Sequence, residues 1–198
     1  MANNIILASS SPRRLEILTK MGVTPKVVAP NIIEKIGSKE SPTLYIKRLS
    51  LEKAQAVAAN YANDFIVAAD TIVLKGAKIL EKPANVEEAH KMLTTLKGGR
   101  HNVLTAFTVA SPGAGRKFIT KVVKTSVLVK NLSAQEIQWF LNSGQWEGKS
   151  GGYAIQGLFE VFVKQVNGSI SNVIGLPMMQ VYNTLVGLGF QFPYDSRK

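Results

Sequence analysis

Short apolar runs separated by polar turns mark the first strands that the sequence predicts. Residues 5–8 and 65–69 are apolar throughout and are bounded by polar residues, which is typical of buried strands. Two longer strand-like stretches follow at 101–110 and 117–130. The sequence Ser-Pro-Gly-Ala-Gly joins them and predicts a hairpin. A further strand is expected over 158–166, because a strong hairpin signal, Asn-Gly, comes directly after it.

Helix-start signals lie between these strands. Pro12 and Pro42 each follow a serine, and proline is well tolerated in the first turn of a helix. Asn85 and Ser133 each precede a glutamate by three residues, which is the spacing of a capping box. A last helix is expected to begin at Pro177. Because strands and helices alternate early and hairpins come later, the sequence predicts an α/β fold with a mixed sheet.

Length and composition favour one folded domain. The chain has 198 residues, which suits a single domain spanning 1–198 or one domain with two lobes. It is 45% hydrophobic and 19% charged, as is usual for a globular protein. The absence of cysteine excludes disulfides, thiolate zinc sites and a cysteine nucleophile, and it fits a reducing cytosol. No signal peptide is visible, and no apolar run approaches the roughly 20 residues of a membrane span.

The formal net charge of +11 favours anionic partners. Nucleic acid, an anionic membrane surface and phosphorylated small molecules all fit that charge. Many of the lysines are scattered, however, and no dense basic block of the kind found in nucleic-acid-binding arms is present. The net charge is therefore compatible with a small phosphorylated ligand, but it does not distinguish such a ligand from the other anionic partners.

The sequence between the first strand and the first helix is suited to an anion. Ser9, Ser10 and Ser11 supply hydroxyl donors, and Arg13 and Arg14 supply guanidinium groups that match phosphate oxygens. A strand that leads into a helix start also leaves backbone N–H groups and the positive end of the helix dipole available. The alternative is that the arginines are merely the exposed start of a helix.

One carboxylate and several lysines are further candidates for chemistry. Asp70 directly follows the buried run 65–69, where open α/β sheets usually bind ligands, and it could bind Mg²⁺ or act as a general base. The alternative is a helix cap or a turn. Lys53, Lys82 and Lys149 could surround a polyphosphate or simply be solvated. The sequence around Lys149 has three residues between its glycines where a Walker A loop has four, so an ordinary P-loop is rejected.

Other catalytic signatures are missing from the sequence. His90 and His101 are isolated, so structural or surface roles are expected for them. No His/Cys cluster suits zinc, and no GxSxG nucleophile elbow occurs.

Five short motifs, taken in order, carry a resemblance to a known family. They are LASSSPRR (7–14), AADT (68–71), LEKP (80–83), GKSGGYAIQG (148–157) and VIGLP (173–177). Together they resemble the Maf family of nucleotide pyrophosphatases from residue 5 to about 190. The resemblance implies a Maf/ITPase-like α/β fold: a mixed twisted sheet flanked by helices, with two lobes around a deep cleft. It also implies a cytoplasmic protein that forms a homodimer and has no specific nucleic-acid or membrane partner.

The implied activity is the hydrolysis of a nucleoside triphosphate to the monophosphate and pyrophosphate with a divalent metal, Mg²⁺ or Mn²⁺. By the same resemblance Asp70 is the catalytic base, and Asp70 and Glu34 hold the metal. The expected phosphate-binding residues are Ser9, Ser11, Arg13, Arg14, Lys53 and Lys82.

Three positions bear on substrate choice within the resemblance. Arg13, Thr71 and Gln156 match the branch of the family that acts on dTTP and UTP. A branch that acts on 7-methyl-GTP carries an aromatic residue, Gln and Glu at those positions, and it is the alternative within the family. Two alternatives of other classes stay open at this point: a nucleic-acid-binding or cell-division-regulating module supported by the net charge, and a nucleotide sensor without turnover.

Overall fold

A computed structural model describes residues 4–193 and divides the chain into two compact units. The first unit comprises Met1–Asp70, Thr105–Val123 and Gly175–Lys198. The second comprises Thr71–Leu104 and Lys124–Ile174. The chain passes from one unit to the other inside strands β3 (Phe65–Lys75), β5 (Arg100–Ala110) and β6 (Phe118–Val129), and once more between Ile174 and Gly175.

The seven strands form one mixed sheet, as the sequence predicts. The strand order is β2-β1-β3-β5-β6-β7, with β4 paired to β3 off this path. β1 (Ile5–Ala8) runs parallel to β2 (Lys26–Val27) and to β3. β4 (Lys78–Leu80) and β7 (Val163–Asn167) pair antiparallel with β3 and β6.

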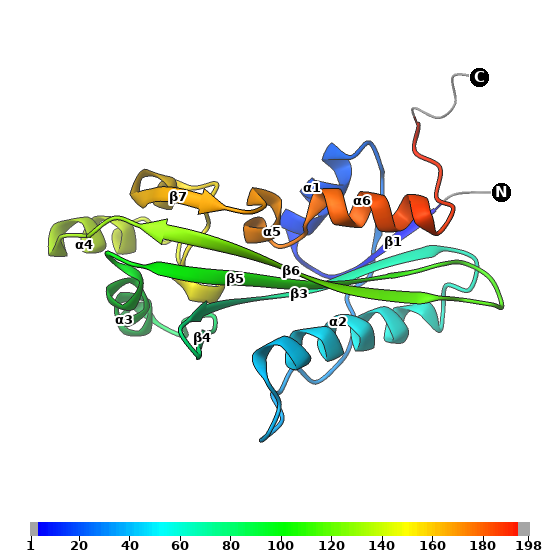
Figure 1. Cartoon of the computed structure of the whole chain (residues 1–198), viewed down its shortest axis with the longest axis horizontal. Helices are drawn as coiled ribbons and strands as arrows, with labels where there is room; N and C mark the ends of the chain where they lie inside the picture. The colour runs from blue at the N-terminus through cyan, green and yellow to red at the C-terminus, as the bar shows by residue number, and fades with distance from the viewer. Residues whose placement is uncertain (1–3, 194–198) are drawn as a thin grey trace. The chain divides into compact units, whose positions relative to one another are not determined.

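Helices cover both faces of the parallel strands in the first unit. Figure 1 shows α1 (Pro12–Lys20) and α6 (Met178–Gly187) on one face of β1 and α2 (Pro42–Ala58) on the other. Side chains of a strand alternate between faces, and alternate strand residues therefore pack on α2. The result is a buried hydrophobic cluster between the strands and α2. It contains Ile6, Ala8, Ile66 and Ala68 of the strands with Ala54, Val57 and Ala58 of α2.

The second unit has its own core under α3 (Val86–Leu96) and α4 (Ala134–Asn142), which pack against each other (Figure 1). Aromatic rings fill its centre: Phe159 stacks on Tyr153 with ring centroids 4.3 Å apart and meets Phe140 edge-on at 5.2 Å. Such pairs add to the stabilisation that burial alone gives.

Side-chain caps begin three of the helices, as the Ser-Pro and capping-box sequences predict. Ser133 and Glu136 form the complete reciprocal box of α4. Asn85 caps α3, but the carboxylate of Glu88 accepts from the Ala84 N–H, so the predicted second box is not reciprocal. Ser41 accepts from the Leu44 N–H at the start of α2, which spans 17 residues. Within 4–193 no helix is both long enough and apolar enough to cross a membrane.

The strand predicted over 158–166 is wrong in its first half. Residues Leu158–Phe162 form the 3₁₀ helix η2, and only Val163–Asn167 is a strand. Phe159 and Phe162 are both buried against the aromatic core. Their spacing of three places them on one side of a 3₁₀ turn, whereas a strand would point them to opposite faces. After Gly168 the chain enters the short helix α5 (Ile170–Ile174) and not a second hairpin strand.

A buried polar pair lies in the core of the second unit. His101 is 2% exposed, and its Nε2 lies 2.6 Å from the Tyr153 hydroxyl. Burial, and after it the positive charge of Lys75, lowers the pKa of His101 from 6.5 to about 4. Burial also raises the pKa of the Tyr153 hydroxyl. His101 therefore has a structural role, as expected, and it is neutral in the folded protein at neutral pH.

This pair predicts a loss of stability in mild acid. Between pH 6.5 and 4 the unfolded chain binds the His101 proton and the folded chain does not, so the free energy of unfolding falls as the pH falls. Between pH 7 and pH 5 His101 contributes a loss of about 2 kcal/mol. We expect His101→Gln to remove that part of the pH dependence when unfolding in urea is compared at the two pH values. An equal pH dependence in wild type and variant would contradict the assignment.

Candidate active site

The serine turn lies at the carboxyl end of the parallel strands. The β1–β3 pairing ends at Ala8 and Ala68, and α1 begins at Pro12. Ser9 is buried, and its Oγ accepts from the Ser11 N–H at 3.2 Å. The Ser11 side chain makes no capping bond to α1. The turn thus presents a helix N-terminus and serine hydroxyls where ligands bind in parallel α/β sheets.

Arg13 and Arg14 differ in their surroundings. Arg14 donates from Nε to the Gly175 carbonyl and from Nη1 to Ser9 Oγ, each at 3.0 Å. Burial lowers the pKa of Arg14, while the negative charges of Asp70 and Glu34 act in the opposite direction. Arg13 is half-buried, and desolvation lowers its pKa as well. Arg14 therefore supports the serine turn directly, and both arginines place positive charge beside it.

Lys53, Asp70 and Glu34 form one ion-paired cluster. The Lys53 ammonium lies 2.6 Å from Asp70 Oδ1 and 2.8 Å from Glu34 Oε1. The side chains of Lys53 and Asp70 are 6% and 12% exposed, whereas that of Glu34 is 51% exposed. Buried charges persist only when they are paired. The structure thus brings together three of the residues that the sequence singled out.

Asp70 does not end its strand, contrary to the expectation. β3 continues to Lys75, because Val73–Lys75 pairs with β4 in a hairpin. Asp70 nevertheless lies two residues beyond Ala68, the last residue of β3 that pairs with β1. Its carboxylate therefore still follows the parallel part of the sheet, which is the position that the sequence argument required.

The cluster has the donor set for a hard cation. Two carboxylates converge on a single positive centre, here the Lys53 ammonium. Mg²⁺ is commonly held by one or two carboxylates together with phosphate oxygens and water. Over residues 4–193 no group of three or more His, Cys, Asp or Glu side chains could hold a metal ion by itself. The residues fit a metal that arrives with a phosphorylated substrate better than one held by protein alone.

The remaining candidates lie in the second unit. Lys82 and Gln156 are exposed, and Thr71 is half-buried, with its carbonyl accepting from Ser150 Oγ at 3.4 Å. The motifs LEKP and GKSGG lie together, because the Gly151 N–H donates to the Glu81 carbonyl at 3.0 Å. Gly151 has φ +73, and a Cβ there would meet Val73 at 3.0 Å, so only glycine suits this position.

A family model matches residues 4–188, and its description is Maf-like protein. The chain belongs to the Maf family. The dTTP/UTP pyrophosphatase of Zymomonas mobilis is 41% identical to this Maf-family chain over 99% of the chain and 96% of the relative. The dTTP/UTP pyrophosphatase of Caulobacter vibrioides is 42% identical over 94% and 96%. A solved HAM1 protein structure from Coxiella burnetii aligns with a TM-score of 0.49 and 11% identity over 94% of this chain and 100% of that one.

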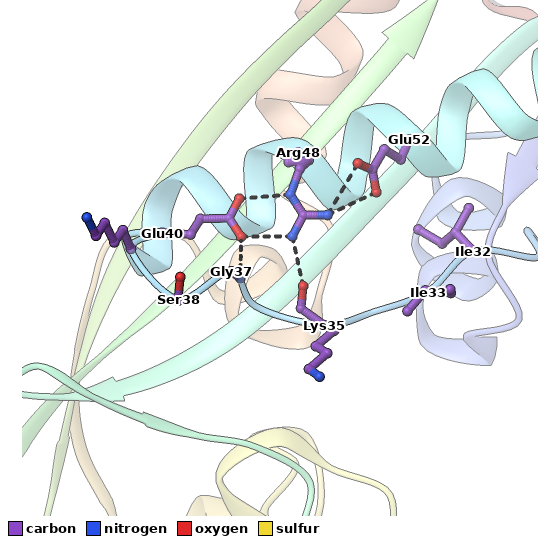
Figure 2. Close-up of a pocket in the computed structure, with 9 residues that line it drawn as sticks. Ile32, Ile33, Lys35, Gly37, Ser38, Glu40, Arg48 and Glu52 are labelled. Carbon is purple, nitrogen blue, oxygen red and sulfur yellow. Dashed lines mark hydrogen bonds and ion pairs between the residues drawn. The ribbon is translucent and has the colours of Figure 1, made fainter.

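The sequence argument missed Arg48 on α2 of this Maf-family protein. Arg48 donates to carboxylate oxygens of both Glu40 and Glu52, and all three line an open pocket (Figure 2). The only signal in the sequence is that Arg48 and Glu52 are four residues apart, a spacing that places them together on a helix.

The ion-paired cluster predicts that stability depends strongly on Lys53, the cation that Asp70 and Glu34 share. Lys53→Met leaves Asp70 as a buried carboxylate without its closest cation. We expect this variant to lose about 3 kcal/mol of unfolding free energy. The double variant Lys53→Met/Asp70→Asn should recover most of that loss, because no unpaired buried charge remains. Urea unfolding at pH 7 measures both values, and a Lys53→Met protein as stable as wild type would overturn the electrostatic account.

Proposed function

We propose that this Maf-family protein is a nucleoside triphosphate pyrophosphatase that hydrolyses dTTP and UTP to the monophosphate and pyrophosphate. Curated relatives about 40% identical over nearly the whole chain carry the name dTTP/UTP pyrophosphatase. The observation that carries the proposal is the ion-paired Asp70 at the carboxyl end of the parallel strands, with Glu34, Lys53 and the serine turn in the same unit.

The proposed reaction is an attack of water on the α-phosphorus. The water oxygen forms a bond to that phosphorus, and the bond from the α-phosphorus to the bridging oxygen breaks. Pyrophosphate leaves with the bridging oxygen. Asp70 accepts the proton of the water, and Lys53 holds the Asp70 carboxylate through Oδ1. Arg13, Lys53 and the serine turn offset the negative charge that develops on the phosphates.

A divalent cation, Mg²⁺ or Mn²⁺, would be held by Asp70 and Glu34 together with phosphate oxygens. It would supply neutralisation of the triphosphate charge. The two carboxylates already share one cationic partner, which supports their assignment as the protein's ligands. Lys82 and Arg14 are proposed as further phosphate-binding residues on the family motifs in which they occur.

Arg13, Thr71 and Gln156 are proposed to decide which nucleotide is hydrolysed. They match the pattern of the dTTP/UTP branch, and neutral Thr and Gln side chains can exchange hydrogen bonds with the edge of a pyrimidine.

Replacement of Gln156 by Glu introduces a charge that suits a cationic methylated guanine. The variant should therefore lose turnover of dTTP and UTP relative to 7-methyl-GTP.

Asp70→Asn tests the catalytic assignment. The amide cannot accept the proton of the attacking water, so we expect the release of pyrophosphate from dTTP to fall at least about 100-fold. Asp64→Asn makes the same chemical change in the turn before β3 and serves as the matched control with near wild-type activity. Activity of Asp70→Asn comparable to that of the control would remove Asp70 from the mechanism.

Chelation tests the proposed metal. With EDTA in excess we expect no release of pyrophosphate from dTTP or UTP, and addition of Mg²⁺ or Mn²⁺ should restore it. Glu34→Gln removes one proposed ligand and should raise the Mg²⁺ concentration needed for half-maximal rate. Turnover that persists in EDTA would show that the reaction proceeds without a divalent cation.

A further inference from the structure

The segment between β2 and α2 carries Glu34 and forms one wall of an open pocket. Its residues are mostly exposed, and Figure 2 shows them beside the first turns of α2. The pocket is lined by Ile32, Ile33, Lys35, Gly37, Ser38, Lys39, Glu40, Arg48 and Glu52. An exposed segment of this kind has little apolar burial to fix it, yet Glu34 must reach Lys53.

Arg48 bonds this segment to α2. Its Nε and Nη2 donate to the two carboxylate oxygens of Glu40 at 2.8 Å each, and Nη2 also donates to the Lys35 carbonyl at 2.9 Å. Its Nη1 donates to the Glu52 carboxylate at 3.1 and 3.2 Å. One guanidinium therefore joins two points of the segment to the helix that carries Lys53 (Figure 2).

Glu40 connects this attachment to the backbone of Gly37, within the same segment. Its Oε2 accepts from the Gly37 N–H at 3.0 Å, and its own N–H donates to the Gly37 carbonyl at 3.1 Å. The hydrogen bonds from Arg48, and then that from Gly37, lower the pKa of Glu40 to about 2. Glu40 is therefore ionised at neutral pH, and its carboxylate can accept the bidentate pair of hydrogen bonds from the Arg48 guanidinium.

The place of Arg48 relates this attachment to the cluster at Asp70. Lys35, whose carbonyl Arg48 holds, directly follows Glu34, and Glu52, which Arg48 also binds, directly precedes Lys53. We propose that Arg48 is a positioning residue that holds residues 35–40 on α2 and thereby keeps Glu34 against Lys53. This inference rests on the proposed function for its effect on catalysis.

The arrangement requires an arginine. Arg48 donates five hydrogen bonds to three residues, and only a planar guanidinium directs its donors along several fixed directions at once. A lysine keeps the positive charge between the carboxylates of Glu40 and Glu52, but it cannot form the bidentate pair of hydrogen bonds to Glu40. Arg48→Lys should therefore give an intermediate effect, and Arg48→Gln the full effect.

The test measures amide exchange in the segment and the kinetics of dTTP hydrolysis. Both are measured in wild type, in the single variants Arg48→Gln, Arg48→Lys and Glu34→Gln, and in the double variant Arg48→Gln/Glu34→Gln. We expect the exchange of the Gly37 and Glu40 amides, followed by NMR, to accelerate at least about tenfold in Arg48→Gln. The kcat/KM for dTTP should fall by a similar factor. In the Glu34→Gln background the same Arg48 change should cost little more, because the residue that it positions has already been removed.

Lys47→Gln is the matched control, since it removes one exposed cation from α2 beside Arg48 and should leave both measurements unchanged. Unchanged exchange in Arg48→Gln would overturn the proposal whatever the activity. The double variant gives a second criterion. If its loss of kcat/KM equals the product of the losses in Arg48→Gln and Glu34→Gln, the two residues act independently, and the proposal is overturned as well. If the wild type released no pyrophosphate, the proposed function would be wrong, and the exchange data would still decide whether Arg48 holds the segment.

Discussion

The ion pair between Lys53 and Asp70 is the constraint on which the candidate site depends. Both side chains are almost fully buried, so the charge of Asp70 depends on the ammonium of Lys53, which also pairs with Glu34. The pair joins α2 to β3, and it fixes a carboxylate beyond the last residue of β3 that pairs with β1. The serine turn after β1 lies at the same end of the parallel strands. The position of the pair is thus a consequence of the parallel pairing, which ends both features at one edge of the sheet.

Charge balance also accounts for Glu34 and Arg14, which lie beside this pair. Glu34 supplies a second carboxylate to Lys53, and Arg14 binds Ser9 while it lies in the field of both carboxylates. The outcome is a cluster in which Lys53 pairs with two carboxylates and Arg14 lies in the field of both. Such a cluster can receive a polyphosphate and a divalent cation together, because both the anion and the cation find partners of opposite charge.

Much of this could be predicted from the sequence, because local signals determine the features concerned. The apolar run of β1, the serine turn and Pro12 predict the strand, the turn and the helix start. The capping pair of Ser133 and Glu136 likewise marks the start of α4. Three features could not be predicted, because they depend on distant partners. β3 passes beyond Asp70 since β4 pairs with its end, Phe159 and Phe162 form a 3₁₀ turn to fill an aromatic core, and Arg48 has partners up to thirteen residues away.

Hydrolysis in water labelled with ¹⁸O tests the central claim most directly, because it reports which phosphorus the water attacks. The account predicts that, after one turnover of dTTP, the label is in the thymidine monophosphate and that pyrophosphate is unlabelled. Mass spectrometry of the two products distinguishes the outcomes. Label in pyrophosphate would place the attack at the β-phosphorus, and release of inorganic phosphate with a diphosphate would mean another reaction. Either result would contradict the proposed role of the Asp70 site.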